Sequence, residues 1–175
     1  MIDSEEVPMS AMSGSSEPLL VRYQSAERLE AGHSHTLLLA DSDTTNGAVS
    51  ANRAILEAGA DGPPPHLHHR STEVFFVLDG SLTALAGDQV ITLEKGDFLS
   101  VPPDTAHAFG ASPGSGADVL IVFSPAATKR FEYFRLVDQV IKGQASVDEI
   151  LAADERFDNH FFQSDVWQAA RQTAS

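Results

Sequence analysis

The side chains best suited to chemistry in this 175-residue chain gather in the segment 63–73, which reads PPPHLHHRSTE. The three prolines force an extended backbone, because each fixes φ near −65° and disfavours helix before it. Side chains alternate along an extended chain, so His66 and His68 point to the same face. Glu73 follows at the start of the next strand, and His107 begins a later strand just after a Pro-Pro-Asp turn.

Three neutral imidazoles and one carboxylate make a borderline-hard donor set. Such a set suits divalent Fe, Ni, Mn, Co, Cu or Zn, and hardly Ca or Mg. The chain has no cysteine, which excludes thiolate ligands, disulfides and cysteine nucleophiles. We therefore predict one divalent transition metal ion, of undetermined identity, held by His66, His68, Glu73 and His107. An ion that prefers six ligands would keep two positions open for water, dioxygen or a chelating substrate.

The other four histidines have simpler interpretations. His33 and His35 repeat the His-x-His spacing, but no carboxylate follows at a suitable distance, which favours surface strand residues over metal ligands. His69 is predicted to lie in the turn that precedes Glu73. His160 is expected to be a packed or capping histidine, with a lid over the site as the alternative.

The elements that position these residues are short apolar runs separated by turn residues, from about residue 19 to residue 125. One run ends at Asp79-Gly80, and Gly87-Asp88 has the form of a two-residue hairpin turn. Short strands at roughly 8–12-residue spacing predict an all-β sandwich or barrel. A Rossmann fold would need helices of about 10–15 residues between the strands, and the spacing leaves no space for them.

The pattern changes after Pro125. Apolar residues recur at helical spacing over 131–141, and Gly143 is a stop signal. The segment 146–149 has the form of a capping box that opens a second short helix, and Ser164 is placed to cap a last one. The predicted organisation is a disordered tail over 1–18, a barrel over 19–125, and helices over 126–175 that pack on the barrel.

Charge excludes several kinds of partner. Asp and Glu number 25 against 11 Lys and Arg, which gives a net charge of −14. Such a surface repels nucleic-acid phosphates and anionic membranes. The sequence contains neither the basic segment and apolar run of a secretory signal nor the roughly 20 apolar residues of a membrane helix. We expect a cytoplasmic protein that binds neither nucleic acid nor membrane.

The metal-ligand segment resembles the first motif of the cupins, in which His-x-His is followed by three or four residues, Glu, six residues and Gly. Here the motif consists of His66, His68, Glu73 and Gly80. The family motif also has a glycine before His-x-His. That leading glycine is displaced here, since Ala60 occupies its position.

The second cupin motif is also matched. It consists of Gly, five residues, Pro-x-Gly, two residues and His, and here it corresponds to Gly96, Pro102 and His107. Asp104 replaces the turn glycine, and Asp tolerates turn geometry. Neither departure affects a ligand, and the resemblance covers about residues 50–125.

The resemblance implies a cupin double-stranded β-helix, a small jelly-roll barrel with the metal inside, extended here by C-terminal helices. Within the superfamily it points to single-domain, quercetin 2,3-dioxygenase-like members. These are metal-dependent dioxygenases that act on a flavonol-like or other enolisable aromatic or polyketide molecule, and Glu73 would be the catalytic base. The alternatives are a polyketide cyclase or other non-oxidative cupin of secondary metabolism, and a non-catalytic small-molecule-binding module. Cupins of this size commonly pair through sheet edges, so a homodimer is expected.

Strand alternation extends the prediction to the substrate pocket. Phe75 shares a face with Glu73, and Phe109 shares one with His107. With Phe123, these aromatic rings are predicted to line an apolar cavity beside the metal, with plain core packing as the alternative. Because few Lys or Arg residues fall in the barrel strands, the expected substrate is apolar or aromatic rather than a phosphorylated sugar.

Overall fold

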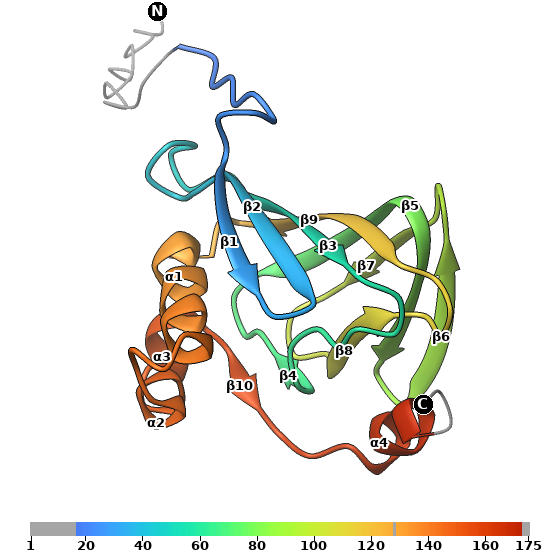
Figure 1. Ribbon diagram of the computed structural model, residues 1–175. Helices are drawn as coiled ribbons and strands as arrows, with labels where there is room; N and C mark the ends of the chain where they lie inside the picture. The colour runs from blue at the N-terminus through green and yellow to red at the C-terminus, as the bar shows by residue number, and fades with distance from the viewer. Residues whose placement is uncertain (1–16, 128, 173–175) are drawn as a thin grey trace, which may run out of the picture.

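The computed structural model describes residues 17–127 and 129–172, and antiparallel strands make up most of it (Figure 1). The strands are β1 (Glu27–Ala31), β2 (Ser34–Ala40), β3 (Ser50–Leu56), β4 (His66–Leu67), β5 (Thr72–Ala86), β6 (Gln89–Glu94), β7 (Phe98–Val101), β8 (His107–Ala111), β9 (Ala117–Ser124) and β10 (His160–Phe161). The helices are α1 (Arg130–Ile141), α2 (Val147–Leu151), α3 (Asp154–Phe157) and α4 (Asp165–Gln172). Most of the tail predicted to be disordered lies outside the described residues.

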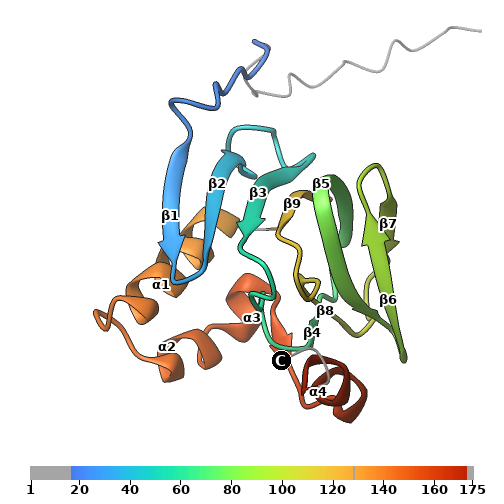
Figure 2. The same ribbon diagram turned by 45° about the vertical axis from the view of Figure 1, so that its right-hand side comes forward.

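Strand β5 organises the sheet, because different parts of it pair with different neighbours. Its first half lies between β7 and β9, and its second half lies between β6 and β8. The path through the sheet runs β1-β2-β3-β9-β5-β8-β4-β10, with antiparallel pairing. The strands curl around a common interior (Figure 2). The predicted all-β jelly-roll architecture is therefore confirmed.

The interpretation of Asp79-Gly80 as the end of a strand is wrong. Strand β5 continues through both residues from Thr72 to Ala86, and its register with β9 shifts between Val77 and Asp79. Gly80 has a φ of 75°, which a residue with a side chain rarely adopts. The glycine therefore bends one long strand at the point where β5 changes partners.

Gly80 also marks a close approach of two backbones, which leads to a stability prediction. A Cβ atom at this position would lie 1.9 Å from the carbonyl oxygen of Gly116, whereas a Cβ at Gly87, with a φ of 67°, would meet nothing within 4 Å. Gly80→Ala is expected to lower the free energy of unfolding by about 3 kcal/mol or more, and Gly87→Ala by about 1–2 kcal/mol. Urea unfolding of both variants measures the difference, and equal losses would contradict the clash.

The helices lie at two places around the barrel (Figure 1). Helix α1 contacts β1, and α2 and α3 follow it on the same side. Helix α4 lies against β6, where Trp167 packs on Leu85 and Ala108. Ser164 caps this helix by accepting a hydrogen bond from the backbone N–H of Trp167, at 3.3 Å. In the described part of the chain, no helix is long and apolar enough to cross a membrane.

Candidate metal centre

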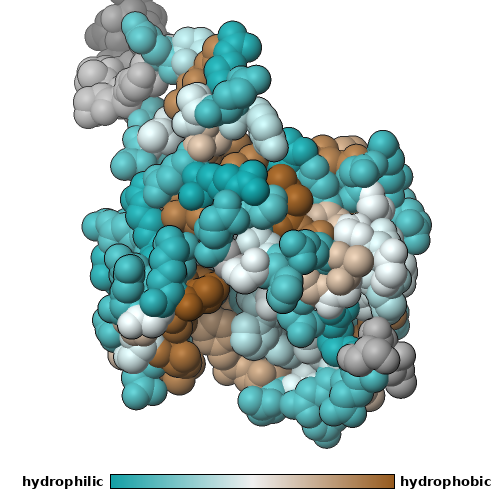
Figure 3. All heavy atoms as spheres, in the orientation of Figure 1, coloured by the Kyte–Doolittle hydropathy of each residue, from teal (hydrophilic) through white to brown (hydrophobic). Residues whose placement is uncertain are grey.

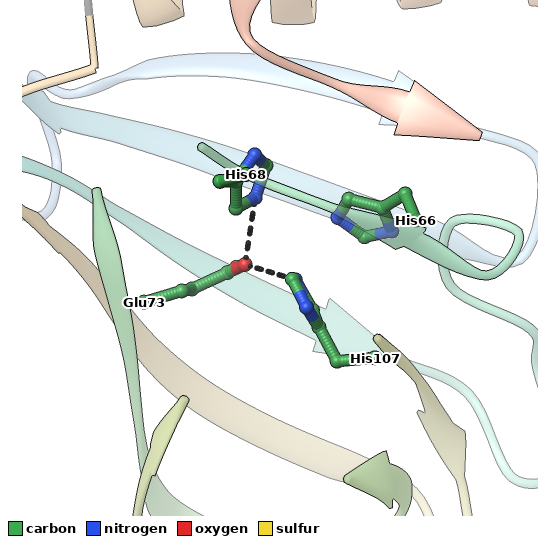
Figure 4. Close-up of side chains that lie close together, drawn as sticks. All are labelled: His66, His68, Glu73 and His107. Atoms are coloured by element: carbon green, nitrogen blue, oxygen red, sulfur yellow. Dashed lines mark hydrogen bonds and ion pairs between the residues drawn. The ribbon is translucent and has the colours of Figure 1, made fainter. Parts of the chain in front are cut away.

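The four predicted metal ligands come together inside the barrel (Figure 4). His66 begins β4, Glu73 is the second residue of β5, and His107 begins β8, where it pairs directly with His66. His68 lies in the segment between β4 and β5. All four side chains are at most 3% exposed, and one ligand atom from each lies within 4.8 Å of the others. The strand register thus joins residues that are up to 41 positions apart (107 − 66 = 41).

Hydrogen bonds to the backbone set the orientation of all three rings. Each imidazole places its Nδ1 atom against a backbone carbonyl oxygen. Nδ1 of His66 lies 2.9 Å from the carbonyl oxygen of Pro64, and Nδ1 of His107 lies 2.8 Å from that of Thr105. Nδ1 of His68 contacts the carbonyl oxygen of Asp158. A carbonyl only accepts hydrogen bonds, so Nδ1 carries the proton and donates. In the neutral ring the lone pair then lies on Nε2, which is the atom available to a metal.

The carboxylate of Glu73 lies among these Nε2 atoms. Its Oε2 atom is 2.7 Å from Nε2 of His107 and 3.0 Å from Nε2 of His68. Neutral rings in this orientation would turn lone pairs toward a carboxylate oxygen, which is unfavourable unless a cation or protons lie between them. Metal–nitrogen and metal–oxygen bonds are about 2.0–2.2 Å long, so two ligand atoms that bind one ion at right angles lie roughly 3 Å apart. The donor set and its spacing therefore fit a divalent transition metal ion.

The pKa shifts follow from the same contacts. Burial favours the neutral form of Glu73, but hydrogen bonds and charge from His107 and His68 outweigh it and hold the pKa of Glu73 well below its ordinary value. Burial, together with the neighbouring His107 and His68, lowers the pKa of His66 well below its ordinary value. The centre thus combines an ionised carboxylate with at least one imidazole that is neutral near pH 7.

Asp158 supports the ligand segment, and the sequence interpretation missed it. Its carbonyl accepts the hydrogen bond from His68, and its carboxylate accepts hydrogen bonds from the backbone N–H groups of His69 (2.9 Å) and Arg70 (3.0 Å). The residue is 2% exposed and has a left-handed backbone, with a φ of 54°. The Asp-Asn pair that ends at Asn159 was the available signal, because both residue types tolerate this conformation.

The two departures from the expected glycines are accommodated in different ways. Asp104 adopts a φ of 61°, and its backbone N–H donates to the carbonyl of His68 at 2.7 Å. The leading glycine is replaced in effect by Gly62, where a Cβ atom would lie 2.5 Å from the carbonyl oxygen of Phe109. Gly59 has open space around its Cα atom. The close approach that requires glycine therefore occurs at Gly62.

A cavity of about 740 Å³ opens beside the metal-ligand group, and His66, His68 and Glu73 line it. Phe109 and Phe123 line it as predicted, together with residues of α1, α2 and β10. The third predicted pocket residue does not line the cavity. Phe75 is buried in the core behind it, with its ring 5.3 Å from that of Phe109 in an edge-on arrangement.

The cavity predicted to be apolar also contains a cation. Arg130, the first residue of α1, is 2% exposed and lines the cavity. Few Lys or Arg residues fall in the barrel strands, whereas Arg130 comes from a helix. Its spacing from Tyr133, Phe134 and Val137 is that of one helical face, which was the signal available in the sequence. Burial raises the pKa of the Tyr133 hydroxyl to about 12.

Residues 52–123 match the family model of the cupin domain. This part of the chain is similar to cupin domains. Over 88 residues the chain is 33% identical to quercetin 2,3-dioxygenase of Bacillus subtilis. This alignment covers 46% of this chain and 26% of that protein. Over 66 residues it is 36% identical to the oxidoreductase iacF of Pestalotiopsis fici, which covers 37% of this chain and 32% of that protein. The chain thus spans about a quarter to a third of the length of these curated relatives.

A solved structure shares the fold of this part of the chain. An RmlC-like cupin from Shewanella frigidimarina superposes with a TM-score of 0.53 at 22% sequence identity, over 63% of this chain and 93% of the other. At this level of identity the likeness concerns the fold alone. The chain therefore shares the cupin fold, and residues 52–123 are similar to cupin domains in sequence.

The remaining histidines lie outside the cupin ligand group. Among the described residues, the four ligands form the one cluster of histidine and acidic side chains whose geometry could hold a metal ion. His33 is exposed and pairs with Glu57 at 2.9 Å, and His35 lies in the cavity wall. His160 packs its ring 4.2 Å from that of His69, while the next residue, Phe161, lines the cavity.

Proposed function

We propose that the protein is a metal-dependent dioxygenase of the quercetin 2,3-dioxygenase-like cupin type, acting on a flavonol-like or other enolisable aromatic or polyketide molecule. The observation that carries this proposal is a buried three-histidine, one-carboxylate group that opens into a cavity of about 740 Å³. That volume is in the range of pockets that enclose small organic ligands. The similarity to quercetin 2,3-dioxygenase over 88 residues supports the same reaction type.

In this proposal His66, His68 and His107 hold a divalent transition metal ion through their Nε2 atoms, and Glu73 holds it through its carboxylate. When bound, such an ion supplies Lewis acidity toward an enolate oxygen and, if it is redox-active, reactivity toward dioxygen. The Nδ1 hydrogen bonds keep the rings in the ligating orientation, so little reorganisation is needed when the ion binds.

Glu73 has a further task in this proposal, which is to remove the proton of the substrate hydroxyl. Its carboxylate is ionised at neutral pH, because an ordinary glutamate is already deprotonated there and a neighbouring metal cation would favour the charged form. It also lies at the cavity wall, within reach of a hydroxyl that binds beside the ligands. Phe109 and Phe123 exclude water from the deprotonated substrate, which would otherwise be protonated again by solvent.

Oxygen uptake is the experiment that tests the reaction type. After metal analysis of the purified protein, uptake is recorded with a panel of flavonols and hydroxyquinones while substrate loss is followed by absorbance. Dioxygen consumption in proportion to substrate loss is the expected result, because a dioxygenase incorporates both oxygen atoms. Substrate that is bound but left unchanged would instead indicate a binding module.

A second candidate is a non-oxidative cupin, such as a polyketide cyclase. It is favoured by the proximity of a carboxylate proton acceptor to a Lewis-acid site, a pair that promotes enolisation without any oxidant. Conversion of substrate at an unchanged rate under nitrogen, without oxygen uptake, is the outcome that would select this alternative.

A further inference from the structure

A buried cation lies in the cavity and has no anionic partner. The guanidinium of Arg130 donates from Nη1 to Oδ1 of Asn159 at 2.7 Å. Its Nε and Nη2 atoms are buried and have no hydrogen-bond partner. Within the described part of the chain, Arg130 forms no ion pair, although buried charges in proteins are normally paired.

Aromatic stacking does not satisfy the free donors. The guanidinium carbon lies 4.2 Å from the ring centroid of Phe123 and 5.3 Å from that of Tyr133. A cation–π contact attracts the charge, but it supplies no oxygen acceptor for the N–H donors of the guanidinium. The rings therefore help to hold Arg130 in place, and Nε and Nη2 remain without a hydrogen-bond partner among the described residues.

The neighbouring carboxylates are already engaged elsewhere. Asp41 accepts hydrogen bonds from the backbone N–H groups at the start of α1, at 3.1 and 3.0 Å. Asp158 accepts from the N–H groups of His69 and Arg70, and Glu73 faces the metal-ligand histidines. Their charges act on Arg130 from a distance and partly offset the effect of burial, which lowers the pKa of the guanidinium.

The same cavity contains an unpartnered acceptor and has an apolar mouth. Oδ1 of Asn52 on β3 is buried and has no hydrogen-bond partner. Hydrophobic surface lies in the hollow between the α1–α2 helices and the barrel (Figure 3). The apolar cavity residues that α1 and α2 contribute are Phe134, Val137, Ile141, Val147, Ile150 and Leu151.

We propose that this cavity selects an amphipathic organic anion, whose charged oxygen, a carboxylate or an enolate, binds Nε and Nη2 of Arg130. A hydroxyl of the same ligand donates to Oδ1 of Asn52, and its apolar body extends between α1 and α2. Arg130 is thus the residue that determines specificity for charge. This inference rests on the proposed function in one respect, which is that the substrate binds in this cavity.

A pair of matched probes tests the charge preference. 1-Hydroxy-2-naphthoate and 1-hydroxy-2-naphthamide have the same ring and hydroxyl but differ in charge. Their dissociation constants are measured by titration calorimetry on the metal-loaded protein, without oxygen so that no turnover occurs. We expect the wild-type protein to prefer the naphthoate by at least 10-fold, and Arg130→Met to reduce this preference at least 10-fold, because the neutral side chain cannot pair with the anion.

Arg135→Met is the matched control. Arg135 is a cation on the same helix, but it lies outside the cavity and pairs with Glu27 on β1 at 2.6 Å. This variant loses the same charge and should keep the wild-type preference. Equal affinity of the two probes for the wild-type protein, binding of neither, or an unchanged preference in Arg130→Met would overturn the inference.

Two further measurements keep the test decisive. Circular dichroism and metal content establish whether Arg130→Met is folded; if it is not, Arg130→Lys is used, which retains the charge without the forked donors. An intermediate preference is then expected, and either an unchanged or an absent preference contradicts the proposal. If no oxygen uptake is observed but the naphthoate is preferred, the dioxygenase proposal is wrong and the charge inference holds. If oxygen uptake is observed but the naphthoate is not preferred, the charge inference is wrong and the dioxygenase proposal holds.

Discussion

Replacing His66 or His107 by alanine is expected to remove the bound metal ion and leave the barrel folded. Each substitution deletes one of four donors, and metal affinity should fall by more than about 100-fold, since loss of a mere hydrogen-bond partner of a ligand costs about 10–100-fold. The barrel should survive because both residues begin strands and direct their side chains into the ligand group, and neither belongs to the apolar core cluster. Metal content by mass spectrometry and thermal unfolding measure the two effects.

His33→Ala is the control for this prediction. It removes an imidazole that is exposed and pairs only with the surface carboxylate of Glu57 among the described residues. Its metal content should equal that of the wild-type protein. Full metal stoichiometry in both His66→Ala and His107→Ala would refute the ligand assignment.

Glu73→Gln is expected to reduce the turnover number by about 1,000-fold or more, with the fold retained. Glutamine has nearly the same shape, but its amide cannot take up a proton, and loss of a general base costs about 100- to 10,000-fold. The same change also replaces a charged ligand by a neutral one, so some metal affinity is lost as well. Turnover must therefore be expressed per bound metal ion in the oxygen-uptake assay.

Glu57→Gln provides the comparison, because Glu57 is an exposed carboxylate that is distant from the ligand group in the fold. This variant should retain wild-type turnover. If Glu73→Gln retained wild-type turnover per metal ion, Glu73 would not be the base, and the proposed function would lose its proton acceptor.

The His66–His68 pair could be predicted from the sequence because its geometry is local. The alternation of an extended chain places His66 and His68 on one face without any knowledge of the fold. Glu73 and His107 join them through strand pairing, which the cupin motif spacing encodes. The all-β class followed for the same reason, since short strands and turns are visible in the residue pattern.

What the sequence did not reveal depends on tertiary contacts. Asp79-Gly80 has the composition of a turn, but pairing with β9 on both sides of the bend holds β5 as one strand. Arg130 reaches the cavity only because α1 lies against the barrel, and nothing in the strands indicates that placement. Asp158 contacts a residue that is 90 positions away in the chain.

The contact between Asp158 and His68 has a consequence for the order in which the protein matures during synthesis. The four candidate ligands have all been synthesised once β8 is complete, yet the carbonyl that orients His68 lies 47 residues beyond Ala111, the last residue of β8 (158 − 111 = 47). Until that later segment docks, the His68 ring lacks the partner that fixes its tautomer. A nascent chain therefore carries these four residues before the His68 ring is held in the orientation that would present Nε2 to a metal ion.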